Sequence, residues 1–185
     1  MVISSIEQFL EYWERIRFRT RRVAVSIPPD KLEWTYSAGK FTLGDLLRHI
    51  AGIERYMFVE CVMGRPSRYP GHGRELADGY EAVLAYLDRL DAESIEQLRT
   101  LTPERLKEKC TTPAGSPITV WKWLRSMAEH EIHHRGQIYL YLSMLGIATP
   151  PLYGLTSEQV RERSQGTFRD IDAGRSFSRD EMNER

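Results

Sequence analysis

The stretch from residue 127 to residue 138 reads Met-Ala-Glu-His-Glu-Ile-His-His-Arg-Gly-Gln-Ile and holds three of the five histidines of the 185-residue chain. If the stretch is helical, His130 and His134 lie about 40° apart around the helix axis and roughly 6 Å apart along it. Both imidazoles can then reach one metal ion. The stretch therefore predicts a helix that supplies two metal ligands, and a third ligand must come from elsewhere in the chain.

The helix that carries this stretch is predicted to begin near Thr119 and to end at Gly146, a residue that suits a left-handed C-terminal cap. Its two candidate ligands replace apolar residues in the buried stripe. Two imidazoles turned inward without a partner would cost several kcal/mol of desolvation, which favours a metal ion that binds both. The inner positions are Val120, Leu124, Met127, His130, His134, Ile138, Tyr141 and Leu145.

Three more long amphipathic helices are predicted from apolar residues spaced by three and four. The first covers residues 4–27, with Ser4 and Glu7 in capping-box spacing, and prolines follow it. The second covers residues 42–63, and the third residues 75–101. No strand-like alternation longer than a few residues competes with these helices.

His49 lies in the second helix between Leu46 and Ile53, on the face that is predicted to be buried. A lone histidine on such a face is more often a hydrogen-bonded core residue than a metal ligand. His72 lies in a glycine-rich loop with no periodic partner, which predicts a surface position. Spacing alone therefore leaves His49 open between the two interpretations.

These elements predict an all-α protein, an up-and-down type four-helix bundle over residues 1–150 with a C-terminal appendage over residues 151–185. The appendage starts with a short helical segment near Thr156. We expect it to be partly flexible, because polar residues dominate from about Ser164. Bundles bind metal ions between facing helices, so the predicted fold suits the histidine site.

The composition argues against nucleic acid and membranes as partners. Lys plus Arg and Asp plus Glu number 26 each, so the formal charge is zero. No segment approaches the ~18 apolar residues of a membrane span. Cys61 and Cys110 have no CxxC spacing and are expected to be free thiols in a reducing compartment. We therefore expect a soluble cytoplasmic protein.

Basic residues gather in the first helix and could suggest phosphate binding. They spread around much of the helix, and acidic residues balance them elsewhere in the chain. We therefore interpret them as a solvated face with scattered ion pairs. They are Arg15, Arg17, Arg19, Arg21 and Arg22.

Residues 130–134 also satisfy the H-E-x-x-H pattern of zinc proteases, in which Glu131 would be the general base. A metzincin would continue with glycine at position 137 and histidine at position 140, but this chain has Gln137 and Leu140 there. No strand pattern provides the sheet edge on which such proteases align a peptide. The protease is therefore a minor alternative.

The run from His130 to Ile138, with His49 some eighty residues upstream in Leu-Leu-Arg-His-Ile-Ala-Gly-Ile-Glu, resembles the DinB family of metal-binding four-helix bundles. The resemblance covers roughly residues 5–150. It implies the ligand set His49, His130 and His134, and it leaves His133 as a flanking or interface residue. It also implies one divalent ion per chain, most often zinc or nickel, and often a homodimer.

Three neutral imidazoles leave the ion with its full double charge, which lowers the pKa of bound water or of a bound thiol. We expect a metal-dependent enzyme of small molecules, a hydrolase or a thiol S-transferase with a low-molecular-weight thiol as cosubstrate. The alternative is a damage-inducible metal-binding protein without turnover. Glu54 and Gln137 are candidates to orient a ligand or solvent, with a surface carboxylate and a helix-end hydrogen bonder as the alternatives. Candidates to line the pocket are Trp34, Tyr36, Trp121 and Tyr141.

Overall fold

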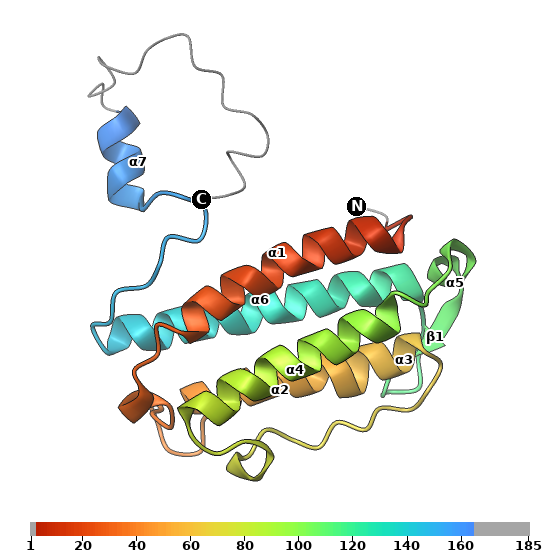
Figure 1. Cartoon of the computed structure of the whole chain (residues 1–185), viewed down its shortest axis with the longest axis horizontal. Coiled ribbons are helices and arrows are strands. Elements are labelled where there is room, and N and C mark those ends of the chain that lie inside the picture. The colour runs from red at the N-terminus through yellow and green to blue at the C-terminus, as the bar shows by residue number, and fades with distance from the viewer. Residues whose placement is uncertain (1–2, 165–185) are drawn as a thin grey trace. The chain divides into compact units, whose positions relative to one another are not determined.

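The computed structural model describes residues 3–164 and divides the chain into two compact units, residues 1–149 and residues 150–185. The first unit is built around four long helical elements that lie side by side (Figure 1). Helix α1 spans Ile6–Ala24, α2 spans Leu43–Ile53, α4 spans Tyr80–Leu98 and α6 spans Val120–Met144. The predicted all-α four-helix bundle is confirmed.

Two of the helix starts follow from side-chain caps. Thr42 accepts a hydrogen bond from the backbone N–H of Asp45, and the Asp45 carboxylate accepts one from the N–H of Thr42, a complete capping box. At the start of α1 the cap is Ser5, whose hydroxyl accepts from the N–H of Gln8. The prediction of Ser4 as the cap was therefore wrong by one residue.

The predicted second helix is one rod of three segments, with two kinds of helical turn. After α2, the segment η2, Glu54–Val59, is a π-helix, and α3, Glu60–Val62, completes the rod. A π-turn holds one more residue than an α-turn. The side chains that follow it are therefore rotated around the axis of the rod relative to a continuous α-helix. Sequence periodicity of 3.6 cannot reveal such a shift.

The connection over residues 63–79 crosses back along the bundle, so α2 and α4 run in the same direction (Figure 1). Two contacts fix this path. Arg65 at the end of the rod reaches Gln97 near the end of α4, and Arg48 near the start of the rod donates to the carbonyl of Ala77. This return is the one departure from a strict up-and-down order, and it lays a loop against the middle of α2.

The remaining elements of the first unit are short. The 3-10 turns η1 and η3 span Pro29–Lys31 and Arg74–Leu76, and helix α5 spans Pro103–Lys107. Strands β1, Lys109–Thr111, and β2, Pro117–Thr119, form an antiparallel hairpin before α6. The hairpin was not predicted, because three-residue strands are too short to show an alternation.

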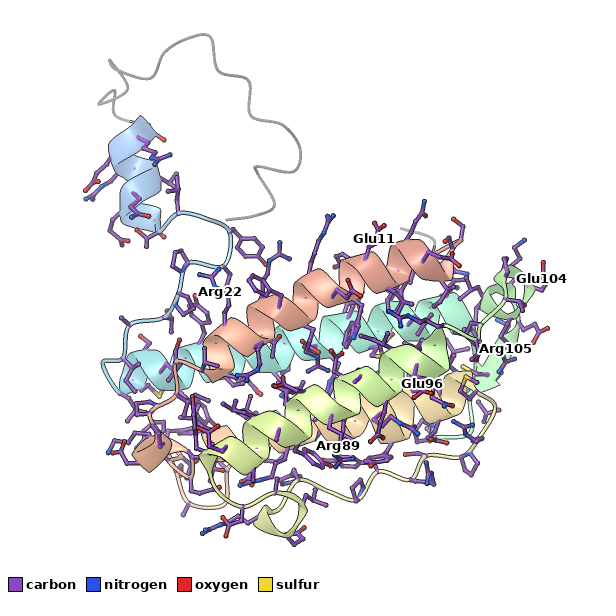
Figure 2. The ribbon with its side chains drawn as sticks, in the orientation of Figure 1. Glu11, Arg22, Arg89, Glu96, Glu104 and Arg105 are labelled. Atoms are coloured by element: carbon purple, nitrogen blue, oxygen red, sulfur yellow. The ribbon has the colours of Figure 1, made fainter. Side chains whose placement is uncertain are left out.

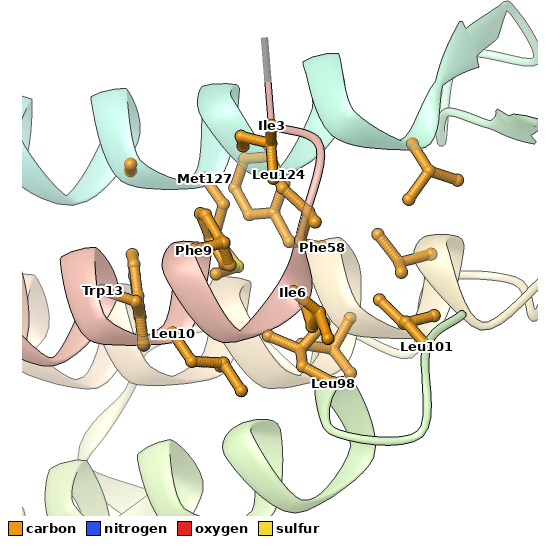
Figure 3. Close-up of a cluster of buried hydrophobic side chains, with 14 of the residues drawn as sticks. Ile3, Ile6, Phe9, Leu10, Trp13, Phe58, Leu98, Leu101, Leu124 and Met127 are labelled. Carbon is orange, nitrogen blue, oxygen red and sulfur yellow. The ribbon is translucent and has the colours of Figure 1, made fainter. Parts of the chain in front are cut away.

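A hydrophobic core lies between the helices, and Figure 3 shows part of it. Trp13 is completely buried, and its indole N–H donates to Asp91 at 3.0 Å. Burial of each large apolar side chain contributes roughly 1.5–3 kcal/mol. Further buried members are Phe9, Ile16, Phe58, Leu98, Leu124 and Met127.

One arginine of α1 lies inside the core. The Arg17 guanidinium pairs with Glu54 of η2, with Asp91 of α4 at 3.2 Å and with Glu131 of α6 at 3.3 Å. Charged residues such as Glu11 do point outward from α1 (Figure 2). For Arg17 the prediction of a solvated face was wrong, because acidic residues from three other helices compensate its burial.

The second unit contains helix α7, Ser157–Ser164. Thr156 caps it, since its hydroxyl accepts from the N–H of Gln159 and the Gln159 amide oxygen accepts from the N–H of Thr156. The predicted flexibility of the tail concerns residues beyond 164, outside the described part of the chain. Within residues 3–164, no helix is long and apolar enough to cross a membrane.

Replacement of Arg17 should destabilise the bundle. Arg17→Met leaves the buried carboxylates of Glu54 and Glu131, and the partly buried one of Asp91, without their shared cation. We therefore expect the free energy of unfolding to fall by about 3–5 kcal/mol. Urea denaturation followed by circular dichroism measures this loss. Arg15→Met, an exposed position on the same helix, is the matched control and should change stability by less than about 0.5 kcal/mol. Equal effects of the two variants would contradict this account of Arg17.

Candidate metal centre

Three imidazoles from two helices meet inside the bundle. The Nε2 atom of His130 lies 3.1 Å from Nε2 of His49 in α2 and 3.1 Å from Nε2 of His134 in α6. One ligand atom from each of the three residues lies within 4.8 Å of the others. The structure thus brings together the three histidines that the family resemblance implies as ligands.

The outer nitrogens of two of these rings are held by hydrogen bonds. His49 Nδ1 lies 2.6 Å from the hydroxyl of Tyr69, and His134 Nδ1 lies 2.6 Å from Oε1 of Gln137. A hydrogen on the Nδ1 atom of His134 would donate to the amide oxygen and would leave the Nε2 lone pair facing the centre. Such partners fix the tautomer and the ring orientation of metal-binding histidines.

His72 also belongs to this environment, contrary to the prediction of a surface residue. Its Nδ1 lies 3.3 Å from the Tyr69 hydroxyl, and its ring packs on Phe41 with 4.1 Å between centroids. Its side chain is half-buried. The loop that returns along α2 places both Tyr69 and His72 beside His49.

Tyr69 was missed by the sequence analysis, because it lies in a loop without periodicity. The signal that could have found it is Gly52, one turn after His49 on α2. A Cβ atom at Gly52 would lie 3.2 Å from the Tyr69 ring, so the small residue makes room for the tyrosine. Glycine in a helix interior costs about 1 kcal/mol relative to alanine and so indicates a packing constraint.

Burial keeps the histidines neutral. Burial, together with a smaller effect of the neighbouring imidazoles, lowers the pKa of His49 to about 4 and the pKa of His130 to about 3. Burial also lowers the pKa of His134. The neutral ring is the form that binds a metal ion, so the apo centre is ready for a cation at neutral pH.

The other candidates of the sequence analysis lie in different places. Glu54 is 2% exposed and pairs with Arg17 in the core instead of orienting a ligand histidine. His133 is exposed, and its ring meets His134 edge-on with 5.0 Å between centroids. Cys61 and Cys110 are free and buried.

The residues that follow the two candidate ligands of α6 anchor this helix to α1. Glu131 is 1% exposed and pairs with Arg17, while Arg135 donates to the carbonyl of Ile16 at 3.1 Å. Each lies about 100° around the helix from the histidine before it. Glu131 is thus part of the core ion pair, which removes it from the position of a protease general base.

The donor set fits a divalent ion. Imidazole nitrogens suit zinc, nickel, copper and iron. Across residues 3–164, no fourth histidine, cysteine, aspartate or glutamate joins the group. Structural zinc sites are usually closed by four protein ligands, whereas catalytic sites keep a position open. The cluster therefore has the composition of an open site.

Comparison with known proteins agrees with this fold. A family model described as the DinB superfamily matches residues 12–138. The match spans more than half of the chain, which belongs to the DinB superfamily. Among curated proteins, an uncharacterised protein of Bacillus subtilis, YrdA, is 21% identical over 164 residues, which cover 85% of this chain and 93% of YrdA.

Solved structures show the same fold. A DinB-like protein from Bacillus cereus superposes with a TM-score of 0.69 at 20% identity, covering 81% of this chain and 99% of that protein. YfiT from Bacillus subtilis, described as a probable metal-dependent hydrolase with an unusual four-helix bundle topology, gives a TM-score of 0.64 at 17% identity, over 80% of this chain and 91% of YfiT. At these identities the likeness concerns the fold alone.

The Tyr69 hydroxyl should strengthen metal binding. Tyr69→Phe removes the partner of His49 Nδ1 while keeping the aromatic ring, so we expect zinc affinity to fall by about 10–100-fold. Competition with a chromogenic chelator measures the affinity. Tyr12→Phe, an exposed position on α1, is the control and should leave it unchanged. A Tyr69→Phe protein with full affinity would refute this role for the hydroxyl.

The stability of the metal-free protein should depend on its buried histidines. As the pH falls below about 6.5, the unfolded chain takes up protons on its histidines. The folded rings of His49 and His130 stay neutral, since their pKa values are about 4 and about 3. The free energy of unfolding therefore falls as the pH is lowered from about 6.5 toward about 4.

Chemical denaturation at several values between about pH 7 and about pH 5 measures this slope, in a range where most carboxylates are still ionised. His130→Gln should make the fall in stability shallower, whereas His133→Gln, at the exposed neighbour, should not. The same slope in all three proteins would contradict the prediction.

Proposed function

We propose that this protein is a metal-dependent hydrolase of small molecules, with the ion held by His49, His130 and His134. The observation that carries the proposal is the convergence of three neutral imidazoles. Among the described residues, no acidic or thiol side chain joins them as a fourth ligand. A divalent ion bound there supplies a Lewis acid that lowers the pKa of water or polarises a carbonyl. The fold shared with YfiT, a probable metal-dependent hydrolase, supports the same class.

The chain itself supplies rigidity. Tyr69 and Gln137 orient two of the rings, and Phe58 packs on His130 with 5.7 Å between centroids. Glu131 and Arg135, each about 100° around the helix from the histidine before it, fix α6 against α1. These contacts hold the three nitrogens in place before an ion arrives, so little reorganisation accompanies binding.

Aromatic residues suggest where an apolar part of the substrate would lie. Tyr141 follows His134 by seven residues, two turns or roughly 10 Å along the same face of α6. Its ring meets Trp34 at 5.6 Å and Tyr36 at 5.4 Å between centroids, and Tyr36 is half exposed. The proposed substrate therefore carries an aromatic or aliphatic group that extends roughly 10 Å from its scissile bond.

The native ion is proposed to be zinc or nickel, because both accept three imidazoles and both bind more tightly than iron(II) in the divalent series. Zinc has the further property that it does not change oxidation state, which suits hydrolysis. Elemental analysis of protein purified without an affinity tag identifies the ion.

The ligand assignment is tested by a pair of variants on one helix. His130→Ala should abolish the stoichiometric metal that survives dialysis, and His133→Ala should retain one ion per chain. Hydrolysis of a panel of activated esters, amides and lactones by the metal-loaded protein should fall at least about 100-fold in the first variant only. Full metal content in His130→Ala would refute the three-histidine site.

The reaction class is tested in the same assays. A low-molecular-weight thiol and an electrophile, such as glutathione and monochlorobimane, replace the hydrolysis substrates. Thiol adducts without hydrolysis would establish the S-transferase instead. A fully loaded protein that turns over neither set of substrates would support a binding protein without catalysis.

A further inference from the structure

A concave region lies where α3 ends, away from the candidate metal centre. Basic side chains dominate its walls. Two cavities, of about 420 Å³ and about 770 Å³, share Arg65 and Pro66 in their walls. Cavities of about 300–1,000 Å³ are the size that small-molecule ligands occupy. The charged residues in the two walls are Arg55, Glu60, Arg65, Arg68, Arg105 and Lys109.

The one carboxylate in these walls is already bound by arginines. Glu60 is completely buried, and its oxygens accept from Arg55 at 2.5 Å, from Arg65 at 2.5 Å and from Arg68 at 2.8 Å. Burial raises the pKa of Glu60, but the hydrogen bonds from the three guanidiniums outweigh burial and hold the pKa at about 2. A single negative charge therefore faces three positive ones.

Neighbouring acids do not restore neutrality. Glu93 lies 3.4 Å from Arg55, and Glu108 lies 2.8 Å from Arg105. With both included, three carboxylates stand against five cations, in a chain whose total charge is zero. Like charges gathered at one place repel, so the cluster favours binding of an anion.

The side chains are also suited to oxyanions. Guanidinium groups present planar forks of N–H donors that match phosphate and carboxylate oxygens. The side chains of Arg65 and Arg68 are 44% and 60% exposed, so part of each fork faces solvent. The larger cavity adds hydroxyl groups of Ser67, Thr111 and Thr112, and Figure 2 shows Arg105 at this end of the bundle.

We propose that these two adjacent cavities, with Arg65 between them, form a binding site for a small molecule with several oxyanion charges, a phosphate ester or a polycarboxylate. The competing explanation is a clamp that only ties the returning loop to α3 through Glu60. Of the three guanidiniums that bind Glu60, Arg65 and Arg68 lie in the returning loop, whereas Arg55 lies on η2. Arg65 alone can tie the loop to α3, and the more exposed Arg68 is the arginine that a ligand can reach most easily. Arg68 therefore separates the two explanations.

Isothermal titration calorimetry with inorganic pyrophosphate and with citrate tests the site. We expect one saturable site per chain that weakens as NaCl rises from about 20 mM to about 200 mM. Arg68→Gln should weaken binding at least about tenfold, as loss of a charge-assisted hydrogen bond implies. Tighter pyrophosphate binding would indicate a phosphate ester, and tighter citrate binding a polycarboxylate.

Three controls make the result decisive. Arg74→Gln removes an equally exposed arginine that lies in neither cavity wall and pairs with Asp78, and it should bind both anions normally. Lys109→Gln, in the wall of the larger cavity, should weaken binding even if Arg68→Gln proves unstable. His130→Ala should bind both anions with wild-type affinity. An anion that was instead chelated by a metal ion at the histidines would lose its site in this variant.

Absence of saturable binding by either anion would overturn the proposal. Unchanged affinity in both Arg68→Gln and Lys109→Gln, or loss of binding in His130→Ala, would do the same. None of these results bears on the metal-dependent activity, which is measured separately.

Discussion

One guanidinium connects the four long elements of this bundle. Arg17 of α1 contacts acidic residues of η2, α4 and α6, so one cation ties α1 to the three other long elements of the bundle. Buried ion pairs contribute little net stability, since desolvation offsets most of their attraction, but a lost partner is costly. The network therefore acts mainly on the specificity of helix packing. If any helix slipped by one turn, a carboxylate would be left in the core without a cation.

The same constraint explains the sequence of α6. Its central run alternates two tasks, because each of the two candidate ligands in α6 is followed by a residue that lies about 100° further around the helix and contacts another helix. Glu131 and Arg135 contact α1, while His130 and His134 face His49 of α2. The H-E-x-x-H pattern thus interleaves a candidate ligand pair with a residue that anchors α6 to α1. Its resemblance to a protease sequence reflects a different use of the same residues.

Sequence patterns predicted the helical elements and the pair His130 and His134. Apolar residues at helical spacing, and polar residues that replace them on the buried face, are signals that can be read locally. The third histidine was less certain, since His49 on a buried face had two interpretations until the resemblance of the sequence to the DinB family was considered. The environment of the site came mostly from segments without a period. Tyr69 and His72 lie in a loop, and only its return along α2 places them beside His49. Arg17 was misjudged because its partners lie 37 or more residues away in three other helices, and no local pattern reports a charge pair across a bundle.

The returning loop has a consequence for how sequence changes act on the molecule. Arg68 and Tyr69 are consecutive residues, yet the first binds Glu60 in the wall of the arginine-lined cavity and the second binds His49 of the candidate metal centre. One short segment therefore supplies a side chain to each of two places. An insertion or deletion in this loop would displace both side chains at once, whereas a substitution at either position would change one place alone.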